Sequence, residues 1–182
     1  MSSFVGRERE LELTAAALEA ARVVTLTGAG GAGKIRLALQ AAGQAAERFG
    51  DGAWLCELAP LRDPAGVDGA VAAVFPVTAR AGQSTRDALA EFLGTKELLL
   101  VLDNCEHLLE GAAALAGVLQ RSCERLVILA TSREGLGIEG ERLVPVPPLG
   151  CRGSMPIWRR SRARRRCACS PTGRPRSNPD SR

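Results

Sequence analysis

Several features are absent from this chain of 182 residues, and each absence excludes a class of protein. No apolar run is long enough to cross a bilayer, so we expect no membrane-spanning helix. The opening residues MSSFVGRERE lack the apolar core of a secretory signal peptide, so we expect a cytoplasmic protein. The six cysteines have no metal-ligand spacing, and we interpret Cys56, Cys105 and Cys123 as reduced packing residues.

Charge is distributed unevenly along the chain, whose net charge is +4. Residues 151–182 contain ten arginines, no lysine and one acid, Asp180, and therefore carry +9, which leaves −5 on residues 1–150. The basic isoelectric point thus comes from the C-terminal segment, and we identify no helix-turn-helix in the sequence. We expect no direct DNA binding by the folded part of the chain.

A glycine-rich loop between a predicted strand and a predicted helix is the most informative stretch. The β-branched run 23–27 leads into a turn rich in glycine, and Lys34 begins an Ala/Leu-rich helix. Glycines let backbone N–H groups converge on an anion, and a helix N-terminus adds partial positive charge. The pattern G-x-x-x-x-G-K therefore predicts a phosphate-binding loop for ATP or ADP, in which Lys34 reaches the β- and γ-phosphates. The predicted nucleotide-binding residues of this loop are Gly28, Gly30, Gly31, Ala32, Gly33, Lys34 and Ile35.

Ile35 stands where such a loop normally has Ser or Thr. The missing hydroxyl is the group that ligates Mg²⁺. We therefore expect a loop that can still hold phosphates, but whose Mg²⁺ placement and hydrolysis are impaired.

The same glycines also fit a dinucleotide-binding fingerprint, G-x-G-x-x-G, formed by Gly28, Gly30 and Gly33. Glu57, at the end of the next apolar run, could then bind the ribose. Lys34 has no role in that alternative, an oxidoreductase domain, and neither does the segment LLLVLDN.

Strand-like segments alternate with helix-like segments, which predicts an α/β fold with a parallel sheet covered by helices on both faces. The predicted strands are 23–27, 53–58, 97–102, 125–130 and 141–146. The predicted helices are 7–21, 34–49, 65–75, 85–93 and 105–120. Pro145 indicates an edge position for the last strand.

Asp103 directly follows the most apolar predicted strand, 97–102. Ligands of open parallel sheets bind at the carboxyl ends of the strands, so this carboxylate can hold Mg²⁺, directly or through water. A strand-terminal Asp can instead cap the next helix. The phosphate-loop pattern upstream favours the metal.

Three polar residues follow Asp103 in the segment NCEH. Asn104 occupies the place where many nucleotide-hydrolysing proteins have an acid that activates water, and an amide cannot act as a general base. Glu106 could compensate, although a Glu at this place is more often a solvated residue in the first turn of a helix. We interpret His107 as a helix-surface residue.

Arg133 ends the segment ATSR after predicted strand 125–130. A guanidinium group forms paired hydrogen bonds with phosphate, so an arginine at this edge could sense a γ-phosphate. The alternative is an exposed loop arginine. Thr131 and Ser132 offer hydroxyl groups beside it.

Four segments occur in one order with sensible spacing: FVGRERELE, LTGAGGAGK, LLLVLDNCEHLL and ILATSREGLGIEGERLVPVPPL. Together they resemble the nucleotide-binding domain of bacterial STAND-type regulatory ATPases, which are related to AAA+ proteins. Such domains are typical of large transcriptional regulators of the LuxR/SARP and adenylate-cyclase-linked kinds. The resemblance covers residues 4–149 of the chain.

This resemblance implies a three-layer P-loop NTPase with strand order 5-1-4-3-2 that switches between ATP and ADP. By position, residues 28–34 match the Walker A loop, Asp103 matches the Mg²⁺ site of Walker B, and Arg133 matches the sensor arginine. The Asp-Asn pair at 103–104 is similar to what the family shows. Related ATPases often self-associate when ATP is bound.

The resemblance also implies a role for the N-terminal residues Val5, Gly6 and Arg7. They match a motif that lies near the adenine in the family. Val5 and Arg7 are therefore expected to bind the nucleotide.

The resemblance ends at residue 149, so we expect a nucleotide-binding domain of residues 1–149 and an Arg/Pro-rich tail of residues 150–182. In the family, a helical lid and a winged-helix domain follow this point. The tail has four prolines, ten arginines and almost no branched aliphatic residues, which predicts disorder. One hypothesis is an out-of-frame product that truncates a regulator. The alternative is a basic arm that contacts nucleic-acid phosphates, although Trp158 is its only aromatic residue.

The sequence therefore predicts an ATP/ADP-controlled regulatory domain of a transcriptional regulator, with slow hydrolysis at most. Lys34, Asp103 and Arg133 are the predicted catalytic residues. Two alternatives stay open: a non-catalytic remnant that binds nucleotide weakly or not at all, and the dinucleotide-binding oxidoreductase.

Overall fold

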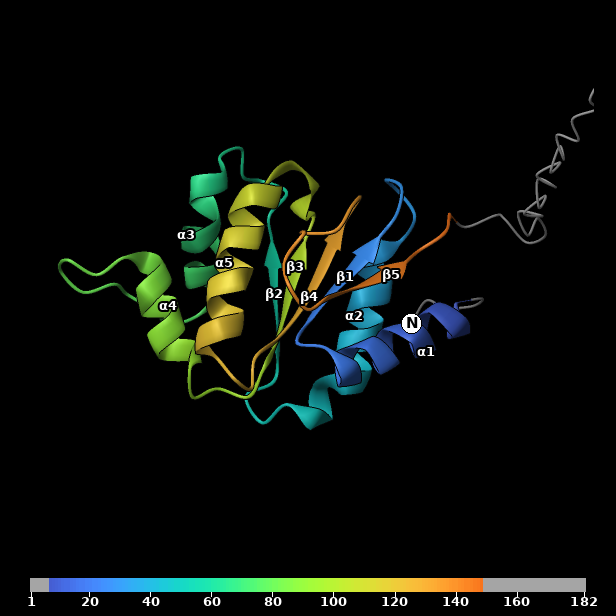
Figure 1. The fold of residues 1–182 in the computed structure, drawn as a ribbon, viewed down its shortest axis with the longest axis horizontal. Helices are drawn as coiled ribbons and strands as arrows, with labels where there is room; N and C mark the ends of the chain where they lie inside the picture. Colours follow the sequence, from blue (N-terminus) through green and yellow to red (C-terminus); the bar gives the residue numbers. More distant parts are fainter. Residues whose placement is uncertain (1–6, 149–182) are drawn as a thin grey trace, which may run out of the picture. The chain divides into compact units, whose positions relative to one another are not determined.

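Five parallel strands form one sheet in the computed structural model, which describes residues 7–148 (Figure 1). The strands are β1 (Val23–Thr27), β2 (Ala53–Glu57), β3 (Leu99–Asp103), β4 (Val127–Ser132) and β5 (Glu141–Pro145). Their order across the sheet is β2-β3-β4-β1-β5, and each neighbouring pair is parallel. The predicted order 5-1-4-3-2 is confirmed, and so is the edge position of the last strand.

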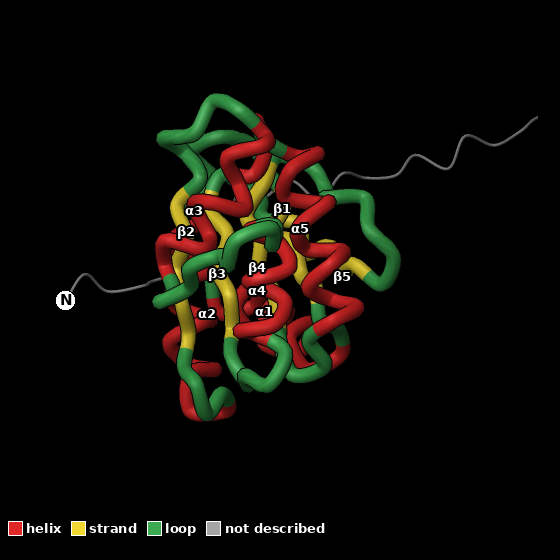
Figure 2. Tube along the Cα trace, turned by 90° about the vertical axis from the view of Figure 1, so that its left-hand side faces the viewer, coloured by secondary structure: helices red, strands yellow, loops and turns green. Residues whose placement is uncertain are grey.

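Helices cover both faces of the sheet. They are α1 (Glu8–Ala20), α2 (Lys34–Ala45), α3 (Val67–Val74), α4 (Thr85–Leu93) and α5 (Leu109–Ser122), with short 3₁₀ turns η1 (Ala46–Arg48), η2 (Pro64–Gly66) and η3 (Cys105–His107). Helices α1 and α2 lie on one face, and α3, α4 and α5 lie on the other (Figure 1). In Figure 2 the layer of α3, α4 and α5 faces the viewer, with the strands behind it.

Alternate residues of the central strands build two separate cores. In β3, Leu100 and Leu102 belong to the core under α3 and α5, whereas Leu99 and Val101 belong to the core under α1 and α2. All four are at most 1% exposed. A strand buried on both faces needs apolar residues at every position, which explains the unbroken run that the sequence shows here.

The structure corrects several predicted boundaries around the sheet. Strand β4 extends to Ser132 rather than ending at residue 130, because its last residues pair with β1. The segment predicted as helix 105–120 begins as η3, and α5 starts only at Leu109. Asn104 causes this break, since its left-handed backbone (φ 64°, ψ 50°) cannot continue into an α-helix.

The sheet order also excludes the dinucleotide-binding alternative. In that fold the first two strands of the chain are neighbours in the sheet. Here β3 and β4 separate β1 from β2, so two strands lie between Glu57, at the end of β2, and the strand that leads into the glycine-rich loop.

Three cysteines lie in the described part of the chain, and all three are buried free thiols, as predicted. Burial, together with the nearby charges of Asp103 and Glu106, raises the pKa of the Cys105 thiol to about 12. Burial also raises the pKa of Cys56 to about 11. Both thiols stay protonated at neutral pH and therefore act as packing groups.

Some predicted features lie outside the described residues, namely Val5, Gly6, the boundary at residue 149 and the tail of residues 150–182. Within residues 7–148, no helix has the length and apolar character that crossing a membrane requires.

Two glycines of α5 provide a test of the packing on the α5 face. A Cβ atom on Gly111 would overlap the backbone carbonyl of Pro64, whereas a Cβ on Gly117 would meet only the flexible end of Arg121, at 3.4 Å. Alanine in a helix is otherwise favoured over glycine by about 1 kcal/mol. We expect Gly111→Ala to lower the free energy of unfolding by about 1–3 kcal/mol, and Gly117→Ala to raise it. Urea unfolding of the two variants measures both changes, and equal effects would contradict the packing described here.

Candidate functional site

The glycine-rich loop connects β1 to α2 at the carboxyl end of the sheet. Gly28 is required by close approach, because a Cβ atom there would overlap the carbonyl of Val146, the residue after β5. Gly33 has a positive φ of 80° immediately before Lys34 begins α2. The loop thus delivers the N-terminus of α2, with its unpaired N–H groups, to the edge of the sheet.

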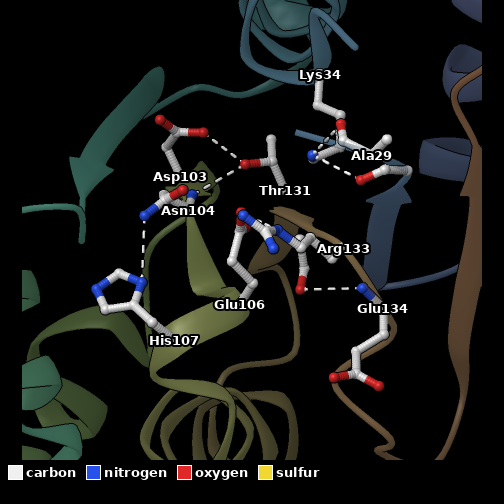
Figure 3. Close-up of polar contacts among 11 residues, drawn as sticks. Ala29, Lys34, Asp103, Asn104, Glu106, His107, Thr131, Arg133 and Glu134 are labelled. Carbon is white, nitrogen blue, oxygen red and sulfur yellow. Dashed lines mark hydrogen bonds and ion pairs between the residues drawn. The ribbon is translucent and has the colours of Figure 1, made fainter. Parts of the chain in front are cut away.

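Lys34 turns its ammonium group back into this loop. Its Nζ atom donates to the carbonyl oxygens of Gly28 at 2.9 Å and Ala29 at 3.2 Å (Figure 3). The residue is only 8% exposed. The two carbonyl partners are neutral, so the positive charge of this enclosed ammonium group is not balanced by them. An anion bound beside Lys34 would balance it best.

A pocket of about 400 Å³ opens beside the loop. Its lining joins the loop to the ends of β3 and β4: Gly30, Gly31, Ala32, Gly33, Lys34, Ile35, Asp103, Asn104, Glu106, Thr131 and Arg133. The structure therefore brings together Lys34, Asp103 and Arg133, which are far apart in the sequence. Gly28 and Arg7 are not part of the lining.

Thr131 joins the ends of β3 and β4 inside this pocket. Its hydroxyl donates to Asp103 Oδ1 at 2.5 Å and accepts from the backbone N–H of Asn104 at 3.0 Å (Figure 3). Thr131 is 1% exposed. Sequence analysis placed the Thr131 hydroxyl after predicted strand 125–130, in a loop. Its contact with Asp103 was therefore not predicted.

The protein oxygens around Asp103 are too few to hold Mg²⁺ alone, so phosphate oxygens of a bound nucleotide and water would have to complete its coordination. Asp103 Oδ1 is occupied by Thr131, and Oδ2 has no hydrogen-bond partner among the described residues. Ile35 lines the pocket but offers no oxygen. Because Mg²⁺ commonly binds one or two carboxylates together with phosphates and water, Asp103 fits as a single protein ligand. Residues 7–148 contain no cluster of three or more His, Cys, Asp or Glu side chains that could hold a metal.

A hydrogen-bonded chain fixes the side chain of Asn104. Its Nδ2 atom lies 3.2 Å from Nδ1 of His107, whose Nε2 lies 3.0 Å from the carbonyl oxygen of Leu61. A carbonyl needs a donor, so Nε2 carries the hydrogen and Nδ1 accepts from Asn104. His107 is exposed, as predicted, but it also orients the amide of Asn104, which the sequence did not indicate.

Glu106 and Arg133 form an ion pair across the pocket. Arg133 Nε lies 3.3 Å from Glu106 Oε1, with the arginine side chain 69% exposed and the glutamate side chain 16% exposed. Arg133 also approaches the loop, since its Nη2 lies 3.7 Å from where a Cβ on Gly30 would be. The alternative of Glu106 as a solvated helix residue is therefore wrong, and its Oε2 atom is buried with no partner among the described residues.

Arg7 supports the loop from outside the pocket. It is 5% exposed, and its Nη2 atom donates to the carbonyl oxygens of Ala32 at 2.5 Å and Pro147 at 3.0 Å. The Nη1 atom is buried and has no partner among residues 7–148. Contact of Arg7 with a nucleotide stays a prediction, whereas its contact with the loop is direct.

Sequence comparison identifies relatives, though no protein-family model matches the chain. An uncharacterised protein of Mycobacterium tuberculosis is 44% identical over 149 residues, which cover 82% of this chain and 38% of that protein. A candidate HTH-type transcriptional regulator of the same organism is 44% identical over 128 residues, covering 70% of this chain and 14% of that regulator. The chain thus spans 38% or less of the length of these curated relatives.

Solved structures share the fold at low sequence identity. Cdc6p from Pyrobaculum aerophilum matches with a TM-score of 0.57 and 17% identity, covering 79% of this chain and 46% of that one. A STAND protein with a tetratricopeptide repeat sensor from Pyrococcus horikoshii matches with a TM-score of 0.53 and 17% identity, covering 80% of this chain and 23% of that chain. The fold is therefore that of P-loop ATPases.

The Thr131 hydroxyl gives a test of the link between β3 and β4. We expect Thr131→Val to lower the free energy of unfolding by about 1–3 kcal/mol, because it leaves the N–H of Asn104 without its partner. Thr131→Ser keeps the hydroxyl and serves as the control. Urea unfolding measures the difference, and a valine variant as stable as the serine variant would exclude this role.

Proposed function

We propose that residues 1–149 form a STAND-type nucleotide-binding domain that binds ATP and ADP, and that the domain is part of a transcriptional regulator. The observation that carries this proposal is the position of Lys34, whose ammonium group lies inside a glycine-rich loop beside a pocket that also contains Asp103 and Arg133. Residues 150–182 are then a segment outside the domain. We expect the domain to act in the cytoplasm.

The comparisons support this proposal in two ways. The similar structures include a STAND protein, and also the ORC2 protein of Aeropyrum pernix in ADPNP–ADP complexes, at a TM-score of 0.56 and 16% identity over 79% of this chain and 48% of that one. The relative with an HTH-type regulator name suggests the regulatory setting.

Each residue of the pocket has a role in this proposal. The N–H groups of the loop and Lys34 bind the phosphates, and Arg133 contacts the γ-phosphate. Asp103 would hold Mg²⁺, which when bound neutralises part of the phosphate charge. By the family resemblance, Val5 and Arg7 are assigned to nucleotide binding on the adenine side, and self-association is assigned to the ATP-bound state.

Hydrolysis at this site is proposed to be slow. Ile35 removes the hydroxyl that would give Mg²⁺ a second ligand from the protein. The same observation favours a second candidate function, a binding-only module that retains a nucleotide without cleaving it. The slow ATPase and the binding-only module differ in the turnover of ATP and not in nucleotide binding.

Calorimetric titration with ATP and ADP, with and without Mg²⁺, tests the proposal on the full chain. We expect Lys34→Ala to weaken binding about tenfold to a hundredfold, because a charge-assisted contact with phosphate is worth about 1.5–3 kcal/mol. Lys96→Ala is the matched control: it removes the other lysine, which pairs with Asp51 at 2.9 Å at the opposite end of the sheet.

A second variant tests the metal site. Ile35→Thr restores the hydroxyl, and we expect it to strengthen the dependence of ATP binding on Mg²⁺ and to raise turnover. Failure of the natural chain to bind either nucleotide, or equal affinities of the natural chain and Lys34→Ala, would refute the proposed function.

A further inference from the structure

We propose that Glu106 is the general base for ATP hydrolysis at this site, and that Arg133 keeps it inactive until a γ-phosphate draws the arginine away. This inference rests on the proposed nucleotide-binding function. It assigns a catalytic residue to the pocket and makes its activity depend on which nucleotide is bound.

The surroundings of Glu106 point to this role. Its side chain is 16% exposed and lines the pocket that Lys34 and the loop also line. Oxygen Oε1 faces Arg133, whereas Oε2 is buried and has no partner among the described residues. A buried carboxylate oxygen without a donor is unfavourable, so this carboxylate is only half satisfied by Arg133. Once Arg133 leaves Oε1, a water molecule held against the phosphates can donate to that oxygen.

The other side chains near the pocket are less suited to take a proton. Among the described residues, the acids in its lining are Asp103 and Glu106. Asp103 accepts from Thr131 and is the proposed metal ligand, and Asn104 has an amide that cannot act as a base. Glu134 is exposed, and its side chain points away from Lys34 and Asp103 (Figure 3).

Arg133 connects this base to the nucleotide. While it pairs with Glu106 at 3.3 Å, its guanidinium group engages carboxylate oxygen Oε1, which is then not free to accept a hydrogen bond from water. The arginine side chain is 69% exposed and already approaches Gly30, so it can turn toward a phosphate on the loop. A γ-phosphate carries more charge than one carboxylate and accepts two guanidinium hydrogen bonds, so it competes well for Arg133.

The chemical step follows from this exchange of partners. Glu106 accepts a proton from water as the water oxygen forms a bond to the γ-phosphorus. The bond between that phosphorus and the bridging oxygen of the β-phosphate breaks, and the electron pair leaves with ADP. Inorganic phosphate is the other product, and Glu106 returns its proton to solvent.

The test compares Glu106→Gln with Glu134→Gln in the full chain, each made in the natural sequence and with Ile35→Thr. Calorimetry gives the ATP and ADP affinities, and single-turnover assays give hydrolysis. Removing the ion pair frees Arg133, so we expect Glu106→Gln to bind ATP about two- to fivefold more tightly with ADP binding unchanged. We expect its hydrolysis to fall by about a hundredfold or more. Glu134→Gln should match its parent in both measurements.

A purely structural role for Glu106 predicts the opposite change in affinity. If Glu106 only holds Arg133 in place for the γ-phosphate, Glu106→Gln binds ATP more weakly, and that result overturns the proposal. Hydrolysis by Glu106→Gln at the rate of Glu134→Gln also overturns it. Both results presuppose a natural chain that binds ATP, so they are distinct from a natural chain that binds neither nucleotide, which would refute the proposed function itself.

Discussion

The insertion of β4 between β1 and β3 is the constraint on which the site depends. It places the end of β1, where the glycine-rich loop begins, beside the ends of β4 and β3. Thr131 of β4 then bridges to the end of β3, because its hydroxyl hydrogen-bonds with Asp103 and with the backbone N–H of Asn104. Without this strand order, Lys34 and Asp103 would not line one pocket, whatever the local sequence around each of them.

The sequence predicted the elements that repeat a simple physical pattern. Unbroken apolar runs marked the buried strands, and glycines followed by Lys34 marked the glycine-rich loop between β1 and α2. The strand order came from family resemblance, since apolar patterns show that a strand is buried but not which strands are its neighbours. The positions of the strands and of the glycine-rich turn before α2 were predictable because each depends on few residues that are close in the chain.

The contacts within the pocket were harder to predict, because they depend on atoms from separate strands. Nothing in the sequence shows that Glu106 faces Arg133, or that His107 contacts both Asn104 and Leu61. The left-handed backbone of Asn104 turns the chain into a 3₁₀ turn, and this turn changes where the side chains of NCEH point. A prediction that began a regular helix at residue 105 therefore placed Glu106 in solvent.

The bracing of the loop by Arg7 has a mechanical consequence. One nitrogen atom of Arg7 donates hydrogen bonds to the carbonyl oxygens of Ala32 and Pro147. Val146 donates its backbone N–H to the carbonyl oxygen of Thr27, and its own carbonyl packs against Gly28. The loop and residues 146–147 after β5 are thus held together at two points, one through Arg7 and one through Val146. Because these contacts join the two segments, a displacement of the glycine-rich loop also shifts residues 146–147, where the chain leaves the sheet.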